Sequence, residues 1–201
     1  MQKEYSGAGS IDALKDVLLT LGAKRIFLVT GGGSFAASGV EALVSPILAG
    51  VEIDRFSDFA PNPTLEDVEK GILRYRAFAP DCVGAIGGGS VIDMAKSVNV
   101  LAAQEAAPRE YIEGRAKLGS KGKPLVAIPT TAGSGSEATQ FAVVYIGTKK
   151  YSLDHEYILP EYSISDPVCT YQLPASVTAA SGLDALCQGI ESYWSVRSTE
   201  E

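Results

Sequence analysis

Residues 82–96 read CVGAIGGGSVIDMAK, and the architecture of the whole chain follows from this segment. An apolar run from Cys82 to Ile86 meets three glycines and then a helical pattern of small residues, which predicts a buried strand turning directly into a helix. Glycines let the backbone approach a ligand closely, and the start of a helix offers unpaired N–H groups to an anion. The segment therefore predicts a phosphate or pyrophosphate site, with a plain tight turn as the alternative.

Strands and helices alternate along most of the chain. The apolar patterns predict strands at 24–30, 51–56, 82–86, 125–128, 141–146 and 162–164, and helices at 11–21, 34–48, 64–78, 90–103 and 176–194. Thr64 and Ser176 are the expected N-caps of their helices, and residues 104–123 read as a loop. This order predicts an α/β fold, a Rossmann-like parallel sheet flanked by helices.

Composition limits the partners. The chain has 201 residues, 46% hydrophobic content and a formal net charge of −7, which argues against nucleic acid or an anionic membrane as the main partner. No apolar run reaches membrane-spanning length, and the N-terminus lacks the apolar segment of a signal peptide. Cys82, Cys169 and Cys187 are widely spaced, so we expect three reduced, buried thiols in a cytoplasmic protein.

Turns rich in small or hydroxyl residues follow the predicted strands. They are Gly31–Ser34, the Asn62 turn, Gly87–Ser90 and Pro129–Ser136. Because the carboxyl ends of parallel strands share one edge of the sheet, these turns are expected to converge on one crevice, the geometry of a dinucleotide site. The alternative for the last turn is a loop whose serines and threonines cap one another.

The turn at Gly31 bears on the choice of dinucleotide. It has no acidic residue, and an acid at such a position accepts the hydroxyls of the adenosine ribose and repels a 2′-phosphate. NADP therefore stays open beside NAD, although the sequence identifies no basic residue to hold the phosphate. The single histidine, His155, is expected to be a strand or loop residue with a hydrogen-bonded ring.

Asp184 and Gln188 are four residues apart on the last predicted helix, so they share one face. This is the spacing of two metal ligands on a helix, but an amide is a poorer ligand for transition metals than an imidazole. A solvated helix face is the alternative.

Four segments together resemble the iron-containing (group III) alcohol dehydrogenase family. They are GGGSVIDMAK, PLVAIPTTAGSGSEAT, SISDP and LPASVTAASGLDALCQGIESY, in that order along the chain. The resemblance implies a dinucleotide-binding domain over residues 1–175 and the first helix of an all-helical domain over 176–201, with the active site between the two domains.

The resemblance also implies roles for individual residues. Gly88, Gly89, Ser90 and Asp93 would hold the pyrophosphate region of NAD(P)H, and Thr130, Thr131, Ser134 and Thr139 would line the cofactor cleft. Lys150 would approach the ribose, and Asn62 falls in the family's PNP turn on the cofactor side. Gly31 stands where many members carry an aspartate that selects NAD.

In the same way, Asp184 matches the first metal-binding aspartate of the family and Gln188 occupies the position of its first metal-binding histidine. The resemblance implies a divalent metal, Fe or Zn, and the glutamine departs from that pattern. Two roles follow as alternatives: Asp184 binds a metal weakly with the amide oxygen of Gln188, or Gln188 donates a hydrogen bond to the developing alkoxide.

The activity implied is NAD(P)-dependent reduction of a small aldehyde by a homodimer. The segments SDFAPNP, PTTAGSGSEATQFAVVY and ALCQGIESYWS are most similar to the phosphonoacetaldehyde reductase branch, which forms 2-hydroxyethylphosphonate. We expect weak cofactor binding and negligible turnover by these 201 residues alone. The main alternative is a non-catalytic nucleotide-binding fragment or interaction module. A sugar-phosphate lyase or glycerol-phosphate dehydrogenase is a further alternative.

Overall fold

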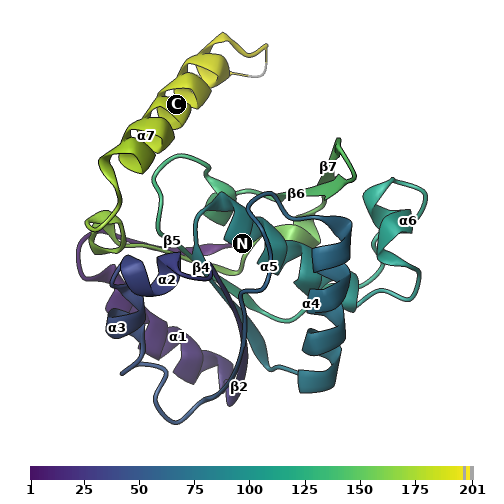
Figure 1. Ribbon diagram of the computed structural model, residues 1–201, viewed down its shortest axis with the longest axis horizontal. Coiled ribbons are helices and arrows are strands. Elements are labelled where there is room, and N and C mark those ends of the chain that lie inside the picture. Colours follow the sequence, from purple (N-terminus) through teal and green to yellow (C-terminus); the bar gives the residue numbers. More distant parts are fainter. Residues whose placement is uncertain (197, 200–201) are drawn as a thin grey trace.

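A six-stranded parallel sheet forms the centre of the computed structural model, which describes residues 1–196, 198 and 199 (Figure 1). Its strand order is β1-β8-β5-β4-β2-β3, and every neighbouring pair is parallel. The strands are β1 (Lys3–Ser6), β2 (Arg25–Thr30), β3 (Glu52–Phe56), β4 (Cys82–Gly87), β5 (Leu125–Pro129) and β8 (Tyr162–Ser165). The predicted α/β fold is confirmed.

Helices cover both faces of this sheet. One layer consists of α1 (Ala13–Leu21), α2 (Ser34–Ala37) and α3 (Val40–Val44). The opposite layer contains α4 (Leu65–Phe78), α5 (Gly89–Ala102) and α6 (Pro108–Ile112), together with the antiparallel pair β6 (Phe141–Ile146) and β7 (Lys149–Asp154). Short 3₁₀ turns lie at Ser10–Asp12, Ser136–Ala138, Glu156–Ile158 and Pro167–Thr170.

The side chains of β2 show how one strand serves both layers. Phe27 and Val29 belong to the core under α4 and α5, whereas Ile26 and Leu28 belong to the core under α1 to α3. Successive side chains of a strand point to opposite faces, so a strand covered on both sides must be apolar at nearly every position. This requirement explains why the central strands read as continuous apolar runs.

Several elements differ from the sequence prediction. The helix predicted over 34–48 is broken into α2 and α3, because Gly39 adopts a left-handed conformation with φ 76°. The segment predicted as a loop contains α6, which begins at Pro108. Strand β7 was not predicted, since its sequence KKYSLD is largely polar and exposed.

The last helix, α7 (Ala175–Trp194), projects away from the body of the molecule (Figure 1). It begins one residue earlier than predicted, with Pro174 rather than Ser176 at the N-cap position, so the predicted cap is wrong. None of its residues is buried. Cys187 is therefore exposed, whereas Cys82 and Cys169 are buried as expected.

The predicted division into residues 1–175 and 176–201 stays a prediction, and residues 197, 200 and 201 lie outside the part that the structure describes. By contrast, the predicted cap at Thr64 is confirmed, because its side chain accepts a hydrogen bond from the amide of Asp67. Within the described residues, no helix has both the length and the apolar character that crossing a membrane requires.

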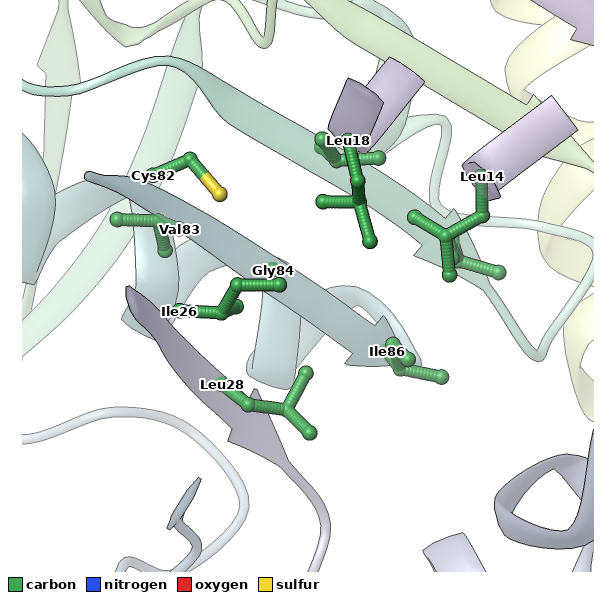
Figure 2. Close-up of a pocket in the computed structure, with 10 residues that line it drawn as sticks. Leu14, Leu18, Ile26, Leu28, Cys82, Val83, Gly84 and Ile86 are labelled. Atoms are coloured by element: carbon green, nitrogen blue, oxygen red, sulfur yellow. The ribbon is translucent and has the colours of Figure 1, made fainter. Parts of the chain in front are cut away.

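Figure 2 shows a small gap between α1 and the sheet, lined by apolar groups that include Leu14, Leu18, Ile26 and Ile128. Its volume of about 10 Å³ is close to that of a single water-sized probe. Because the lining offers almost no polar partner, this gap is a feature of core packing and not a ligand site.

Two adjacent residues of α4 test this layered packing. Ile72 is 4% exposed and Leu73 is 70% exposed. We expect Ile72→Ala to lower the free energy of unfolding by about 2–5 kcal/mol, because it removes buried methyl groups and leaves a cavity. Leu73→Ala should change it by less than about 0.5 kcal/mol. Urea denaturation of both variants measures the difference, and equal losses would contradict the assigned helix face.

Candidate functional site

The turn between β4 and α5 is built to meet an anion. Gly88 occupies the N-cap position, and no side chain caps the helix. Within the described part of the chain, the amide groups of Gly88, Gly89 and Ser90 have no hydrogen-bond acceptor. Together with the helix dipole, these amides favour a phosphate group.

A second turn lies against this one. Gly87 is in register with Pro129 of β5, and the amide of Thr130 donates to the carbonyl of Gly87 at 3.0 Å. A Cβ atom at Gly88 would lie 3.2 Å from Thr131 Oγ1, and a Cβ atom at Gly89 would lie 2.9 Å from Ser134 Oγ. The two turns therefore share one rim of the sheet, as the sequence predicted, and glycine permits their close approach.

The Asn62 turn contacts the same rim. Its backbone amide donates to Ser90 Oγ at 3.2 Å, and Asn62 takes a left-handed conformation with φ 65°. The carbonyl of the next residue, Pro63, accepts from the amide of Tyr145 at 2.8 Å and so ties the turn to β6. Three of the predicted turns are thus connected to one another.

Asp93, predicted to hold the pyrophosphate region, is buried and has both carboxylate oxygens engaged. Ser136 Oγ donates to Oδ1 at 3.0 Å, and the amide of Val143 donates to Oδ2 at 3.1 Å. Burial raises the pKa of this carboxyl group, while the two hydrogen bonds and the charges of Lys96 and Lys150 oppose the shift. The contacts show Asp93 holding the loop after β5 and strand β6 in place. Its contact with a cofactor stays a prediction.

Lys96, one turn further along α5, is a residue that sequence reasoning missed. It is 1% exposed, and its Nζ donates to the carbonyls of Thr139 at 2.7 Å and Phe141 at 2.9 Å. Burial lowers the pKa of Lys96 to about 8, against the opposing charges of Asp93 and Glu137. A lysine inside the otherwise apolar pattern of this helix was the signal that could have revealed it.

The other predicted cofactor residues have varied surroundings. The hydroxyl of Thr139 lies 3.3 Å from Lys96 Nζ, and Thr130 is 8% exposed. Lys150 lies on β7, opposite Tyr145, and its charge opposes the rise that burial causes in the pKa of Asp93. Gly31 directly follows β2, and its carbonyl accepts a hydrogen bond at 3.2 Å from Arg55, a basic residue that the sequence did not identify at this turn. The cofactor contacts of these residues stay predictions.

Gln188 connects α7 to the cleft. Its Nε2 donates to the carbonyl of Gly133 at 3.0 Å, and a Cβ atom at Gly133 would lie 2.4 Å from the carbonyl of Ser181. The helix therefore rests directly on the loop that carries Thr131 and Ser134. The amide that was predicted as a catalytic or metal-binding group acts here as a structural donor.

A metal centre does not form from the described residues alone. They contain no cluster of three or more His, Cys, Asp and Glu side chains that could hold an ion. Asp184 and Gln188 are two side chains, fewer than the three protein ligands of a catalytic zinc site. Their catalytic and metal-binding roles stay predictions, and no step through a metal is derived from them. His155 accepts a hydrogen bond at Nδ1 from the amide of Tyr157, as expected of a structural histidine.

Comparisons with known proteins agree with this geometry. A family model described as iron-containing alcohol dehydrogenase matches residues 2–167. The long-chain-alcohol dehydrogenase 1 of Geobacillus thermodenitrificans (strain NG80-2) is 37% identical over 198 residues, 97% of this chain and 50% of the relative. A 4-hydroxybutyrate dehydrogenase of Cupriavidus necator is 36% identical over 189 residues, 92% of this chain and 49% of the relative.

Among solved structures, sulfoacetaldehyde reductase from Bifidobacterium kashiwanohense in complex with NAD+ superposes with a TM-score of 0.90 at 31% identity. The match covers 96% of this chain and 52% of that one. The chain thus spans about half the length of the curated relatives it matches.

Removing the carboxylate of Asp93 tests its structural role. We expect Asp93→Ala to lower the free energy of unfolding by about 1–3 kcal/mol, because the hydroxyl of Ser136 and the amide of Val143 lose their acceptor. Hydrogen exchange at Val143 should also accelerate. Asp16→Ala, at an exposed position of α1, serves as the control. An unchanged exchange rate at Val143 would contradict the assignment.

The buried lysine predicts a pH dependence of stability. The pKa of Lys96 is lowered to about 8, below the value of about 10.4 for an unfolded lysine. Between these values the unfolded chain binds more protons, so stability contributed by Lys96 rises with pH, by at most about 1.4 kcal/mol per pH unit. The stability of the unaltered chain minus that of Lys96→Met should therefore grow from pH 7 to 10. Lys15→Met, at an exposed position, should give a flat difference, and a flat difference for Lys96→Met would refute the prediction.

Proposed function

The chain belongs to the iron-containing alcohol dehydrogenase family, and from this we propose that it binds NAD(P)H and serves the reduction of a small aldehyde. The observation that carries the proposal is the contact between the Gly88 turn and the Thr131 loop at one rim of the sheet. A dinucleotide lying across this rim would meet free backbone amides from one side and hydroxyl groups from the other.

The roles of the residues follow from their positions. The amides of Gly88, Gly89 and Ser90 would hold the pyrophosphate, since they lie at the start of a 14-residue helix and have no acceptor among the described residues. Thr131 and Ser134 would line the opposite wall. When bound, the nicotinamide supplies a hydride for the carbonyl carbon of the aldehyde. The contribution of these residues is to fix the position of the two reactants.

The substrate that we propose first is phosphonoacetaldehyde, reduced to 2-hydroxyethylphosphonate. Its support is the similarity of three sequence segments to the phosphonoacetaldehyde reductase branch, together with a structural neighbour that is named a reductase of sulfoacetaldehyde. The two aldehydes share a two-carbon skeleton and differ in the phosphonate or sulfonate group. A short aldehyde with an oxoacid group is therefore the substrate class to test.

Homodimer formation and a cytoplasmic location are also part of the proposal. Their support is the family membership and, for association, the exposed apolar side chains of α7, which include Leu183, Leu186 and Trp194. Analytical ultracentrifugation measures the oligomeric state directly.

Fluorescence titration with NADPH and NADH tests the cofactor site. We expect binding by the unaltered chain and at least about a tenfold loss of affinity, about 1.4 kcal/mol, in Gly89→Ala. The added Cβ would lie 2.9 Å from Ser134, so the two walls of the cleft would have to move apart. Gly119→Ala is the control, because a Cβ atom there meets nothing within 4 Å. No binding of either dinucleotide would refute the proposal.

Activity is tested separately, by following NAD(P)H oxidation with phosphonoacetaldehyde, sulfoacetaldehyde and butyraldehyde. The proposal expects the two aldehydes with oxoacid groups to react in preference to butyraldehyde. Because negligible turnover is expected of these 201 residues alone, robust turnover of any aldehyde would contradict that expectation.

A further inference from the structure

We propose that Arg55 makes this cleft selective for NADPH over NADH by binding the 2′-phosphate of the adenosine ribose. The inference rests on the proposed function, since it concerns the same cofactor. It names the residue that chooses between the two dinucleotides, a choice that the sequence left open.

The strand order places the Gly31 turn where an adenosine ribose is expected. Strand β2 lies directly beside β4, with Thr30 in register with Ile86, so the two strands end at the same level of the sheet. In doubly wound dinucleotide sites, an acid near this position accepts the ribose hydroxyls of NAD, and an arginine nearby accommodates the 2′-phosphate of NADP. The turn after β2 has no acid, and its nearest cation is on β3.

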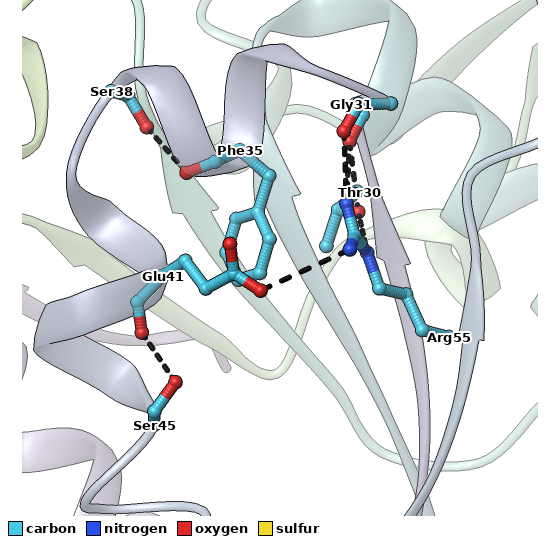
Figure 3. Close-up of polar contacts among 8 residues, drawn as sticks. Thr30, Gly31, Phe35, Ser38, Glu41, Ser45 and Arg55 are labelled. Carbon is cyan, nitrogen blue, oxygen red and sulfur yellow. Dashed lines mark hydrogen bonds and ion pairs between the residues drawn. The ribbon is translucent and has the colours of Figure 1, made fainter.

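Arg55 is held in a fixed orientation under this turn, as Figure 3 shows. Its Nε donates to Thr30 Oγ1 at 2.8 Å, and its Nη2 donates to the carbonyls of Gly31 at 3.2 Å and Gly32 at 3.0 Å. The guanidinium also lies over the ring of Phe35, with its carbon 4.9 Å from the ring centroid. A side chain ordered in this way loses little entropy when it binds an anion.

One nitrogen of this guanidinium remains available. Among the described residues, Nη1 makes no hydrogen bond, and its nearest carboxylate is that of Glu41 at 3.9 Å. The Arg55 side chain is 35% exposed and borders an open pocket of about 200 Å³ that Glu41 also lines. A phosphate can therefore reach the guanidinium from solvent and form charge-assisted hydrogen bonds with it.

The hydroxyl of Ser34 also lies at this turn. A Cβ atom built on Gly31 would lie 2.0 Å from Ser34 Oγ, so the serine hydroxyl occupies the space that a side chain at position 31 would need. The turn therefore presents a hydroxyl donor and a guanidinium, both of which suit a phosphate, in place of a carboxylate.

The negative charge of Glu41 would repel a bound phosphate. Removing this charge should therefore have the opposite effect to removing Arg55. The Glu41 carboxylate is half-exposed, and Oε1 lies 3.9 Å from Arg55 Nη1, near the upper distance limit for an ion pair. Glu41→Gln should therefore raise the affinity for NADPH and leave that for NADH unchanged, because only the 2′-phosphate carries charge at this end of the cofactor.

The experiment compares the dissociation constants of NADPH and NADH by fluorescence titration. We expect the unaltered chain to bind NADPH at least tenfold more tightly than NADH. Arg55→Leu should lower the affinity for NADPH by 10- to 100-fold while NADH affinity changes less than threefold. Arg25→Leu is the matched control, since Arg25 forms an ion pair with Glu52 at the other end of the same strand pair.

A measurement on the unaltered chain guards against a variant that fails to fold. The second pKa of a phosphate monoester is about 6, so the ratio of NADPH to NADH affinity should fall as the pH drops from 7.5 to 5. Arg55 and Glu41 are the charged side chains that border this pocket. Competition against NADPH by adenosine nucleotides makes the same comparison without the nicotinamide. We expect 2′,5′-ADP, which carries the 2′-phosphate, to compete more strongly than 5′-AMP.

The outcomes separate the two proposals. Failure of both dinucleotides to bind overturns the proposed cofactor and the role of Arg55 with it. Binding of NADH as tightly as NADPH, or more tightly, overturns the role of Arg55 and leaves the proposed function standing. An equal loss of both affinities in a folded Arg55→Leu variant shows that Arg55 only supports the turn, which also overturns the inference.

Discussion

The close approach of two strand-end turns is the constraint on which the rest of the structure depends. A Cβ atom would lie 3.2 Å from Thr131 Oγ1 at Gly88 and 2.9 Å from Ser134 Oγ at Gly89, so both glycines permit a tight approach. The register of β4 with β5 sets this approach, because Gly87 stands opposite Pro129. A rim built in this way exposes backbone amides from one strand end and hydroxyl groups from the next, the combination that a pyrophosphate requires.

Helix α5 holds both sides of that rim. Its first residues belong to the Gly88 turn. Two side chains further along the helix hold the segment after β5 through hydrogen bonds. Asp93 accepts hydrogen bonds from Ser136 and Val143, and Lys96 donates to the carbonyls of Thr139 and Phe141. Burying the charges of Asp93 and Lys96 costs desolvation free energy, which offsets part of the stability that their hydrogen bonds contribute. The main effect of the two side chains is therefore to position the segment after β5. The segment after β5 is thus held by two side chains of α5 through hydrogen bonds within the chain.

Much of this arrangement could be predicted from the sequence, because it depends on local patterns. Continuous apolar runs identified the strands β2, β4 and β5, and Thr64 followed by Asp67 identified the start of α4. The predictions failed where a local pattern competes with tertiary packing. Gly39 divides a helix that the apolar spacing predicts as continuous, and the polar strand β7 exists because β6 offers it a partner. The burial expected for Cys187 failed because α7 leaves the body of the molecule.

The sequence by itself determined the alternation of strands and helices, the glycine turn after β4 and the absence of an acid at Gly31, since each of these is a property of neighbouring residues. The tertiary structure alone decided that Lys96 holds the loop before β6 and that Arg55 occupies the underside of the Gly31 turn. The partners of a side chain depend on strand order and register, which bring together residues 24 to 45 positions apart in these contacts. A linear pattern carries no record of such pairs, because the hydrogen bonds form only after the sheet has assembled.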